Sequence, residues 1–151
     1  MRLQELISSL PPESVRAFGR GLDPEIQSLD YDSRCVSNGS LFFAIKGAQT
    51  DGHLHIPEAI QKGAVAVVSS QPAPPDLDVI WIQVKAIRAS MGILATCFYR
   101  HPSRRLKLIG VTGTNGKTTT TFLIHSILGK QGSTMLMGTI KAKVGEWEYK
   151  L

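Results

Sequence analysis

Apolar and polar positions recur with two different periods along the first hundred residues, which predicts a mixed α/β domain. Helical spacing of large apolar residues predicts a short helix over 2–10 and a longer helix over 86–99. A third helix over 57–62 begins at Pro57 and is closed by Gly63. Alternating or continuous apolar runs predict buried strands at 26–31, 41–45, 64–68 and 79–84.

A second unit is predicted to begin after residue 105. The segment 101–105 is typical of a linker, because its proline ends the preceding helix and its charges favour water. The pattern then predicts a strand at 106–111, a loop at 112–116, a helix at 117–128 and a strand at 134–140. This order indicates a β–α–β unit with a glycine-rich first turn. We therefore expect one domain over 1–103 and a second that begins at 104.

The second unit is expected to be incomplete. Residues 106–151 supply two or three strands and one helix, too few to cover both faces of a parallel sheet. The last stretch, 144–151, carries no signal that ends a domain. We therefore expect this chain to be an N-terminal fragment of a longer protein. We do not expect its 151 residues to catalyse a complete reaction.

Composition excludes several protein classes. Hydrophobic residues make up 42% of the 151 residues and charged residues 19%, which indicates a globular chain rather than a disordered one. No apolar run approaches the roughly 18–20 residues needed to span a bilayer. The first residues lack the apolar core of a signal peptide. Cys35 and Cys97 form no CxxC pair, so we expect free thiols in the reducing cytoplasm.

The net charge of +5 is unevenly distributed. Residues 1–102 carry nine basic and ten acidic residues, whereas residues 103–151 carry eight basic residues and only Glu146 and Glu148 as acids. Basic residues form no run of five and are rarely interleaved with aromatics, so the pattern does not favour nucleic-acid binding. Acidic residues beyond Leu151 would balance the excess.

The segment 112–119, Thr-Gly-Thr-Asn-Gly-Lys-Thr-Thr, carries the clearest chemistry. It follows a predicted strand and opens a predicted helix, the context of a phosphate-binding loop. Gly113 and Gly116 let backbone N–H groups turn towards a phosphate, and the helix N-terminus adds donors and partial positive charge. Lys117 can reach the β- and γ-phosphates, and the Thr118 hydroxyl is a hard oxygen ligand suited to Mg²⁺.

The glycine spacing departs from the usual pattern. Five residues separate Gly110 from Gly116, and Val111 occupies the position of the usual first glycine. The alternative to a phosphate-binding loop is an ordinary glycine-rich turn that happens to have a lysine at the start of the next helix. Metal-holding acids must come from beyond the chain or from Glu146 and Glu148, which resemble the solvent face of an alternating strand.

The segment 112–119 resembles the ATP loop of the Mur ligases and of the related folylpolyglutamate synthases. The predicted first domain is similar to the uridine-nucleotide-binding domain of Mur ligases. The matching residues are Asp32-Ser33-Arg34, Gly39 to Ala44, Gly47, Asp51-Gly52-His53, Ala59 and Gly63-Ala64. Residues 98–111 are similar to the join before the ATP domain. The resemblance extends from about residue 26 and is best to the branch that adds the third residue of the peptidoglycan stem peptide.

Other branches fit less well. The D-alanyl-D-alanine-adding ligase shares the first motif set but more often has Ser and a non-Asn residue at the positions of Thr114 and Asn115. Ligases for the first two residues begin with a GxGxxG-type fold, and folylpolyglutamate synthases lack the N-terminal domain. Two further alternatives stay open: a non-catalytic UDP-sugar-binding stub, and a plastid ligase-like protein, which a long transit segment would indicate.

The resemblance implies ATP-driven amide formation on UDP-N-acetylmuramoyl-L-alanyl-D-glutamate through an acyl phosphate. Lys117 would be the catalytic residue and Thr118 would hold Mg²⁺. ATP would be bound by Gly113, Thr114, Asn115, Gly116, Lys117, Thr118 and Thr119. The UDP-sugar would contact Tyr31, Ser33, Ala48, Gln49 and Thr50, while Thr139 aligns with a Gly-Thr near the nucleotide.

The resemblance also implies a cytoplasmic, usually monomeric enzyme without nucleic-acid or membrane partners. Diaminopimelate or lysine would be the amino acid added, and the missing C-terminal domain would choose between them.

Several conspicuous residues also have ordinary structural interpretations. Arg34 is an equally good partner for Asp32, and His53 and His55 fit an exposed loop. His125 is expected to be packed or exposed on its helix, and Trp81 is expected in the core.

Overall fold

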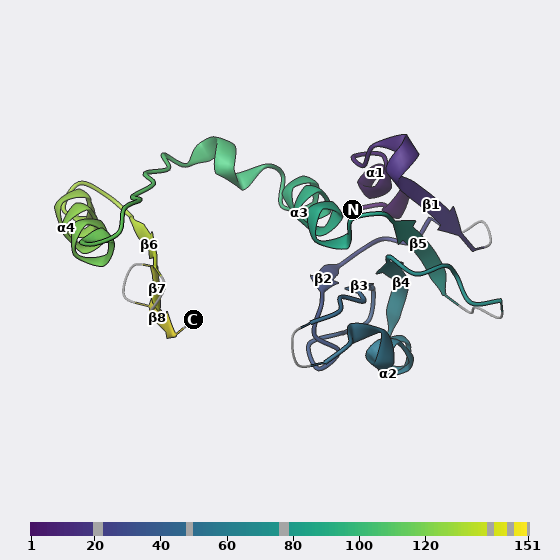
Figure 1. Cartoon of the computed structure of the whole chain (residues 1–151). Helices are drawn as coiled ribbons and strands as arrows, with labels where there is room; N and C mark the ends of the chain where they lie inside the picture. The colour runs from purple at the N-terminus through teal and green to yellow at the C-terminus, as the bar shows by residue number, and fades with distance from the viewer. Residues whose placement is uncertain (20–22, 48–49, 76–78, 139–140, 145–146, 151) are drawn as a thin grey trace. The chain divides into compact units, whose positions relative to one another are not determined.

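The computed structural model describes residues 1–19, 23–47, 50–75, 79–138, 141–144 and 147–150. The chain divides into two compact units, Met1–Arg105 and Leu106–Leu151 (Figure 1).

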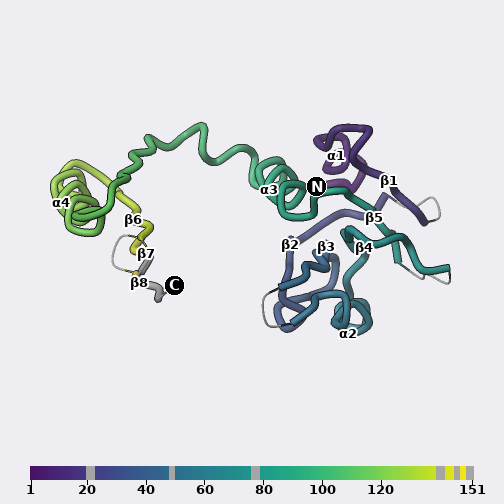
Figure 2. The backbone as a smooth tube through the Cα atoms, in the orientation of Figure 1, coloured from purple at the N-terminus to yellow at the C-terminus, as the bar shows by residue number. Residues whose placement is uncertain are grey.

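Unit 1 is built on a five-stranded sheet with the strand order β1-β5-β4-β3-β2. The strands β2 (Ser28–Asp30), β3 (Ser40–Phe43), β4 (Ala64–Ser69) and β5 (Ile80–Val84) run parallel to one another. The edge strand β1 (Val15–Phe18) pairs antiparallel with β5, which brings residues 15–18 beside the distant 81–84 (Figure 2). β4 is buried on both faces, which explains its near-continuous apolar sequence.

Helices cover both faces of this sheet. The helices α1 (Leu3–Ile7) and α3 (Ile87–Phe98) contribute to one buried cluster, and α2 (Ile56–Gln61) contributes to the other. Alternate residues of β3 and β5 supply the two clusters, because successive side chains of a strand point to opposite faces. The first cluster contains Leu3, Leu6, Leu10, Ile26, Leu41, Phe43, Ala66, Val68, Ile82, Val84 and Leu94. The second contains Val36, Phe42, Ala44, Ala59, Ala64, Val67, Val79 and Trp81.

The described residues of unit 1 also form three 3₁₀ turns: η1 (Pro12–Ser14), η2 (Gly52–His55) and η3 (Pro102–Arg105). η2 precedes α2 directly, and the Asp51 side chain caps it by accepting the His53 backbone N–H. This cap fixes the residues that lead from β3 into α2.

Most predicted elements of unit 1 are confirmed, with two differences. The first helix ends at Ile7 instead of residue 10, where the hydroxyls of Ser8 and Ser9 bond to the carbonyls of Glu5 and Leu6. Such side-chain bonds compete with helix continuation. β1 was missed because it is short and mostly exposed, so only its pairing with β5 reveals it.

Unit 2 combines α4 (Lys117–Gly129) with a three-stranded antiparallel sheet. The sheet strands are β6 (Met135–Met137), β7 (Lys141–Val144) and β8 (Trp147–Lys150), in that order. Leu136 and Ala142 are buried in this unit. The predicted helix at 117–128 is confirmed, and β6 covers the central part of the predicted strand at 134–140, whose residues 139 and 140 lie outside the described chain.

The strand predicted at 106–111 is wrong, because these residues form no strand and Leu108 is exposed. A strand needs a hydrogen-bonded neighbour, and in the described part of unit 2 β6 pairs with β7 instead. The expected β–α–β unit is therefore not formed by these residues, whereas the mixed α/β class with a parallel sheet is confirmed by unit 1. No helix within the described segments is long and apolar enough to cross a membrane.

Candidate functional site

The glycine-rich segment of unit 2 forms a loop that leads directly into α4. Gly116 occupies the N-cap with a φ of 77°, and Gly113 has a φ of 146°. A Cβ at Gly116 would meet no atom within 4 Å, so the backbone conformation alone demands glycine there. The two glycines therefore shape the loop through their φ angles.

Lys117 folds back over this loop. Its Nζ donates to the carbonyl oxygens of Gly113 and Thr114. The first helical backbone bond runs from the Thr120 N–H to the Gly116 carbonyl, at 2.9 Å, so the helix itself supplies no acceptor for the amides of residues 117–119. An ammonium group and several backbone donors thus converge on one exposed helix end, which suits an anion such as a phosphate.

The hydroxyls in the first turn of α4 have different surroundings. Thr121 donates to the carbonyls of Lys117 and Thr118, whereas Thr118 and Thr119 are exposed at the helix start. Glu148 is the one acidic residue in the described part of unit 2, on β8. The described residues contain no group of three or more His, Cys, Asp or Glu arranged for a metal ion.

The turn after β2 carries three of the motif residues in unit 1. Arg34 makes a forked contact with Asp32, with Nη2 to Oδ2 at 2.6 Å and Nε to Oδ1 at 2.9 Å. The hydrogen bonds from Arg34 lower the pKa of Asp32 to about 2. The structural interpretation of Arg34 as the partner of Asp32 is therefore confirmed. Tyr31 presents its side chain to solvent with 69% exposure.

Ser33 is tied to α2 at both its side chain and its backbone. Its hydroxyl donates to Glu58 Oε2 at 2.8 Å, and its carbonyl accepts from Lys62 Nζ at 3.0 Å. Lys62 also donates to Glu58 Oε1 at 2.8 Å. These hydrogen bonds lower the pKa of Glu58, and the bond from Lys62 has a larger effect than the bond from Ser33.

Thr50 joins the same group of side chains through His55. The Thr50 Oγ1 lies 3.1 Å from His55 Nε2, and His55 Nδ1 lies 3.5 Å from Glu58 Oε2. Ser33 and Thr50, both expected to contact the UDP-sugar, thus belong to one polar cluster, called here the Glu58 cluster: Ser33, Thr50, His55, Glu58 and Lys62. Ala48, Gln49 and Thr139 lie outside the described residues.

The sequence interpretation missed His55, Glu58 and Lys62 as members of this group. Their spacing at i, i+3 and i+7 places them on one face of α2 and its preceding turn, which was the available signal. What the spacing could not reveal is that this face lies against the Ser33 turn.

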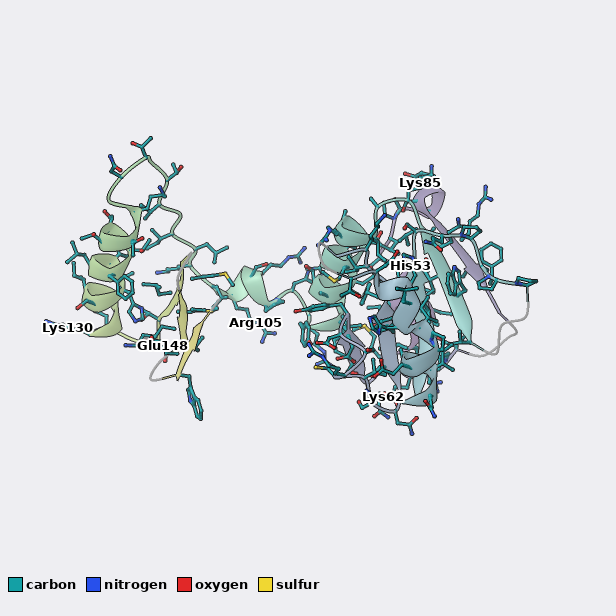
Figure 3. The ribbon with its side chains drawn as sticks, turned by 60° about the horizontal axis from the view of Figure 1, so that its bottom comes forward. His53, Lys62, Lys85, Arg105, Lys130 and Glu148 are labelled. Carbon is teal, nitrogen blue, oxygen red and sulfur yellow. The ribbon has the colours of Figure 1, made fainter. Side chains whose placement is uncertain are left out.

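The expectation of an exposed His53 is wrong. Figure 3 labels His53 within unit 1. Its side chain is largely buried between Asp51 and Ser69, to which its two ring nitrogens are hydrogen-bonded. His55 is only partly exposed, with 43% of its side chain accessible to solvent. His125 is half-buried with Nδ1 hydrogen-bonded to Thr134, and Trp81 lies in the core at 2% exposure, as expected.

Two family models match the chain, one over each unit. They are the "Mur ligase family, catalytic domain" over residues 25–99 and the "Mur ligase middle domain" over residues 111–150. The chain belongs to the Mur ligase family. The first match contains the Glu58 cluster, and the second contains Lys117 and the start of α4. The family resemblance drawn from the sequence motifs is thereby confirmed.

Curated Mur ligases align with nearly the whole of this chain. A UDP-N-acetylmuramoyl-L-alanyl-D-glutamate–2,6-diaminopimelate ligase from Geobacillus thermodenitrificans (strain NG80-2) is 46% identical over 150 residues, 99% of this chain and 30% of the relative. The chain therefore spans about a third of the length of that relative.

Solved Mur ligase structures share the fold. MurF from Acinetobacter baumannii superposes with a TM-score of 0.64 at 27% identity, covering 84% of this chain and 27% of that protein. MurF from Thermotoga maritima, solved in complex with ADP, gives a TM-score of 0.55 at 29% identity, covering 71% and 24%.

Proposed function

We propose that this chain contributes the UDP-sugar-binding unit and the phosphate loop of an ATP-dependent ligase of peptidoglycan precursor synthesis. The enzyme adds the third stem-peptide amino acid to UDP-N-acetylmuramoyl-L-alanyl-D-glutamate. The observation that carries the proposal is the convergence of Lys117 and the free helix-end amides on one loop. The 46% identity to a diaminopimelate ligase supports the substrate class.

The reaction divides into two transfers. The D-glutamate carboxylate attacks the γ-phosphorus of ATP, the bond to ADP breaks, and an acyl phosphate forms. The amine of the incoming amino acid then attacks the acyl carbon, loses a proton and displaces inorganic phosphate. Lys117 would exchange its two carbonyl partners for γ-phosphate oxygens, because a bond between two charged groups is stronger than one to a neutral carbonyl. Its charge then stabilises the transferring group.

The loop also fits a magnesium ion. The Thr118 hydroxyl is exposed in the first turn of α4, beside the proposed phosphate position, and hydroxyl oxygen is a ligand type that Mg²⁺ accepts. The ion would neutralise phosphate charge. We propose that its carboxylate ligands come from parts of the enzyme outside the residues described here.

Unit 1 would hold the UDP-sugar. The exposed ring of Tyr31 can stack on uracil, and the hydroxyls of Ser33 and Thr50 provide hydrogen-bonding groups nearby. Ala48 and Gln49 adjoin Thr50 in the sequence and are part of the proposal. We also propose domain bounds of 1–103 and 104–151, a monomeric state and a cytoplasmic location, where ATP and UDP-linked precursors are available.

The identity of the added amino acid separates two candidates. Diaminopimelate is favoured because the curated relative at 46% identity is named for it. D-alanyl-D-alanine addition is the alternative, supported by structural likeness to an Acinetobacter baumannii enzyme named for that reaction at 27% identity. Lysine is tested alongside, since it differs from diaminopimelate by one carboxylate.

The test is a ligation assay on the complete protein as its source cell makes it. We expect product and ADP to form with UDP-N-acetylmuramoyl-L-alanyl-D-glutamate, ATP and diaminopimelate. Lys117→Ala should weaken ATP binding about tenfold to a hundredfold and lower turnover further. The matched control is Lys130→Ala at the other end of α4, which should keep full activity.

Near-normal turnover of Lys117→Ala would contradict the role of this lysine. Product formation only with D-alanyl-D-alanine and the UDP-linked tripeptide would establish the alternative function.

A further inference from the structure

Glu58 joins two segments that the proposed function assigns to the UDP-sugar. We propose that Glu58 is a positioning residue, which holds the Tyr31–Arg34 turn and the Thr50 loop and orients the hydroxyls of Ser33 and Thr50 as acceptors for N–H and O–H groups of the ligand. This inference rests on the proposed function and names the residue that organises its sugar-nucleotide site.

Both carboxylate oxygens of Glu58 are engaged. Oε1 accepts from Lys62, and Oε2 accepts from Ser33 and faces His55. The partners come from three places in the chain: the turn after β2, η2 and the end of α2. Glu58 is 40% exposed, so it lies at the surface where a ligand can approach the residues it holds.

Ser33 can offer a ligand only an acceptor at its side chain. It has one hydroxyl proton, and that proton points to Glu58 Oε2. Its carbonyl is engaged by Lys62, and the residue is only 6% exposed. Ser33 therefore anchors the turn, and two residues earlier the same turn presents the exposed ring of Tyr31.

The geometry extends this orientation to Thr50 through His55. In neutral His55, the carboxylate at Nδ1 favours the tautomer with its proton on that nitrogen. Nε2 is then an acceptor, so the Thr50 hydroxyl donates its proton to it and keeps its lone pairs free. The Ser33 hydroxyl thus donates directly to Glu58, and the Thr50 hydroxyl donates to His55, which faces Glu58. A uracil N–H, a ribose or sugar hydroxyl and a peptide N–H are the matching ligand donors.

The test measures binding to the complete protein by calorimetry, with UDP-N-acetylmuramoyl-L-alanyl-D-glutamate and ATP in separate titrations. Glu58→Ala should weaken the UDP-sugar about tenfold and leave ATP affinity unchanged. Glu58→Gln should recover part of the affinity, because its amide oxygen still accepts from Ser33. Glu13→Ala, an exposed glutamate of η1, is the matched control and should bind both ligands normally.

A double-mutant cycle tests the route through Ser33. If Glu58 acts by holding Ser33, the two substitutions should not add. The double variant Ser33→Ala/Glu58→Ala should then bind the UDP-sugar only slightly more weakly than the single variant with the lower affinity. Additive losses would overturn the proposed route. Wild-type affinity in Glu58→Ala, or equal losses for both ligands with a lowered melting temperature, would overturn the positioning role. Failure of the wild-type protein to bind the UDP-sugar would instead refute the proposed function itself.

Discussion

His53 holds Ser69 at the end of β4, with its Nε2 atom 3.0 Å from the Ser69 Oγ. Its Nδ1 atom lies 2.6 Å from Asp51 Oδ1, so the three side chains follow the atomic order of a hydrolase triad. Ser69 nevertheless has no exposed surface, and its Oγ also accepts the Gln71 N–H. The contact therefore fastens η2 to the sheet, and no substrate reaches the hydroxyl.

Replacing Ser69 with alanine should destabilise the protein without removing a nucleophile. The change leaves His53 Nε2 and the Gln71 N–H without their buried partner, which costs about 1–3 kcal/mol of unfolding free energy. Urea unfolding measures the loss, with Ser8→Ala as an exposed control. Unchanged stability, or labelling of wild-type Ser69 by a fluorophosphonate, would contradict this structural role.

The Asp32–Arg34 pair should make stability depend on pH in acid. The pKa of Asp32 is lowered from 3.8 to about 2 in the folded protein, chiefly by the Arg34 side-chain bonds. The unfolded chain therefore binds the proton first, so this stabilisation is complete above about pH 4 and is lost as pH falls through about 2.

As the pH is lowered from about 4 to about 2, the melting temperature of Asp32→Asn should fall less steeply than that of the wild type. Some dependence will persist, because the pKa values of Asp51 and Glu58 are also lowered, by His53 and by Lys62 respectively. Identical slopes for variant and wild type would show that the pair is not linked to folding.

Gly116→Ala should weaken ATP binding, whereas Gly110→Ala should have little effect on the loop. Neither new Cβ would meet an atom within 4 Å, but only Gly116 has a left-handed φ, of 77°. An L-residue there costs about 1–2 kcal/mol or shifts the backbone donors. Calorimetric titration of the complete protein with ATP distinguishes the two variants. Equal affinities would argue against a conformational requirement at the N-cap.

Trp81→Ala should strongly destabilise unit 1. The indole is buried against α2 in the second core cluster, and its Nε1 donates to the Gln71 carbonyl at 3.1 Å. Loss of a core aromatic costs about 3–5 kcal/mol of unfolding free energy. Chemical denaturation followed by circular dichroism gives the value, with Leu54→Ala, at an exposed position, as the control. A loss below about 1 kcal/mol would contradict the packing described.

The sequence was most informative where neighbouring residues determine the outcome. β4 and β5 were predicted because runs of β-branched residues favour buried strands, and α3 because its apolar residues repeat at helical spacing. The loop before α4 was recognised because its glycines, lysine and hydroxyl are contiguous. The strand prediction at 106–111 was wrong because it also rested on neighbouring residues alone. Apolar content favours a strand, but it does not supply the second strand with which residues 106–111 would have to pair.

Sequence by itself thus determined the mixed α/β class, the glycine-rich loop before α4 and the family motifs. Tertiary structure decided the edge position of β1, the burial of His53 and the assembly of the Glu58 cluster. Ser33 and Glu58 are 25 residues apart, and His53 and Ser69 are 16 apart. Such pairs form only when sheet register and helix packing bring distant segments together, because a hydrogen bond requires its two atoms within about 3 Å.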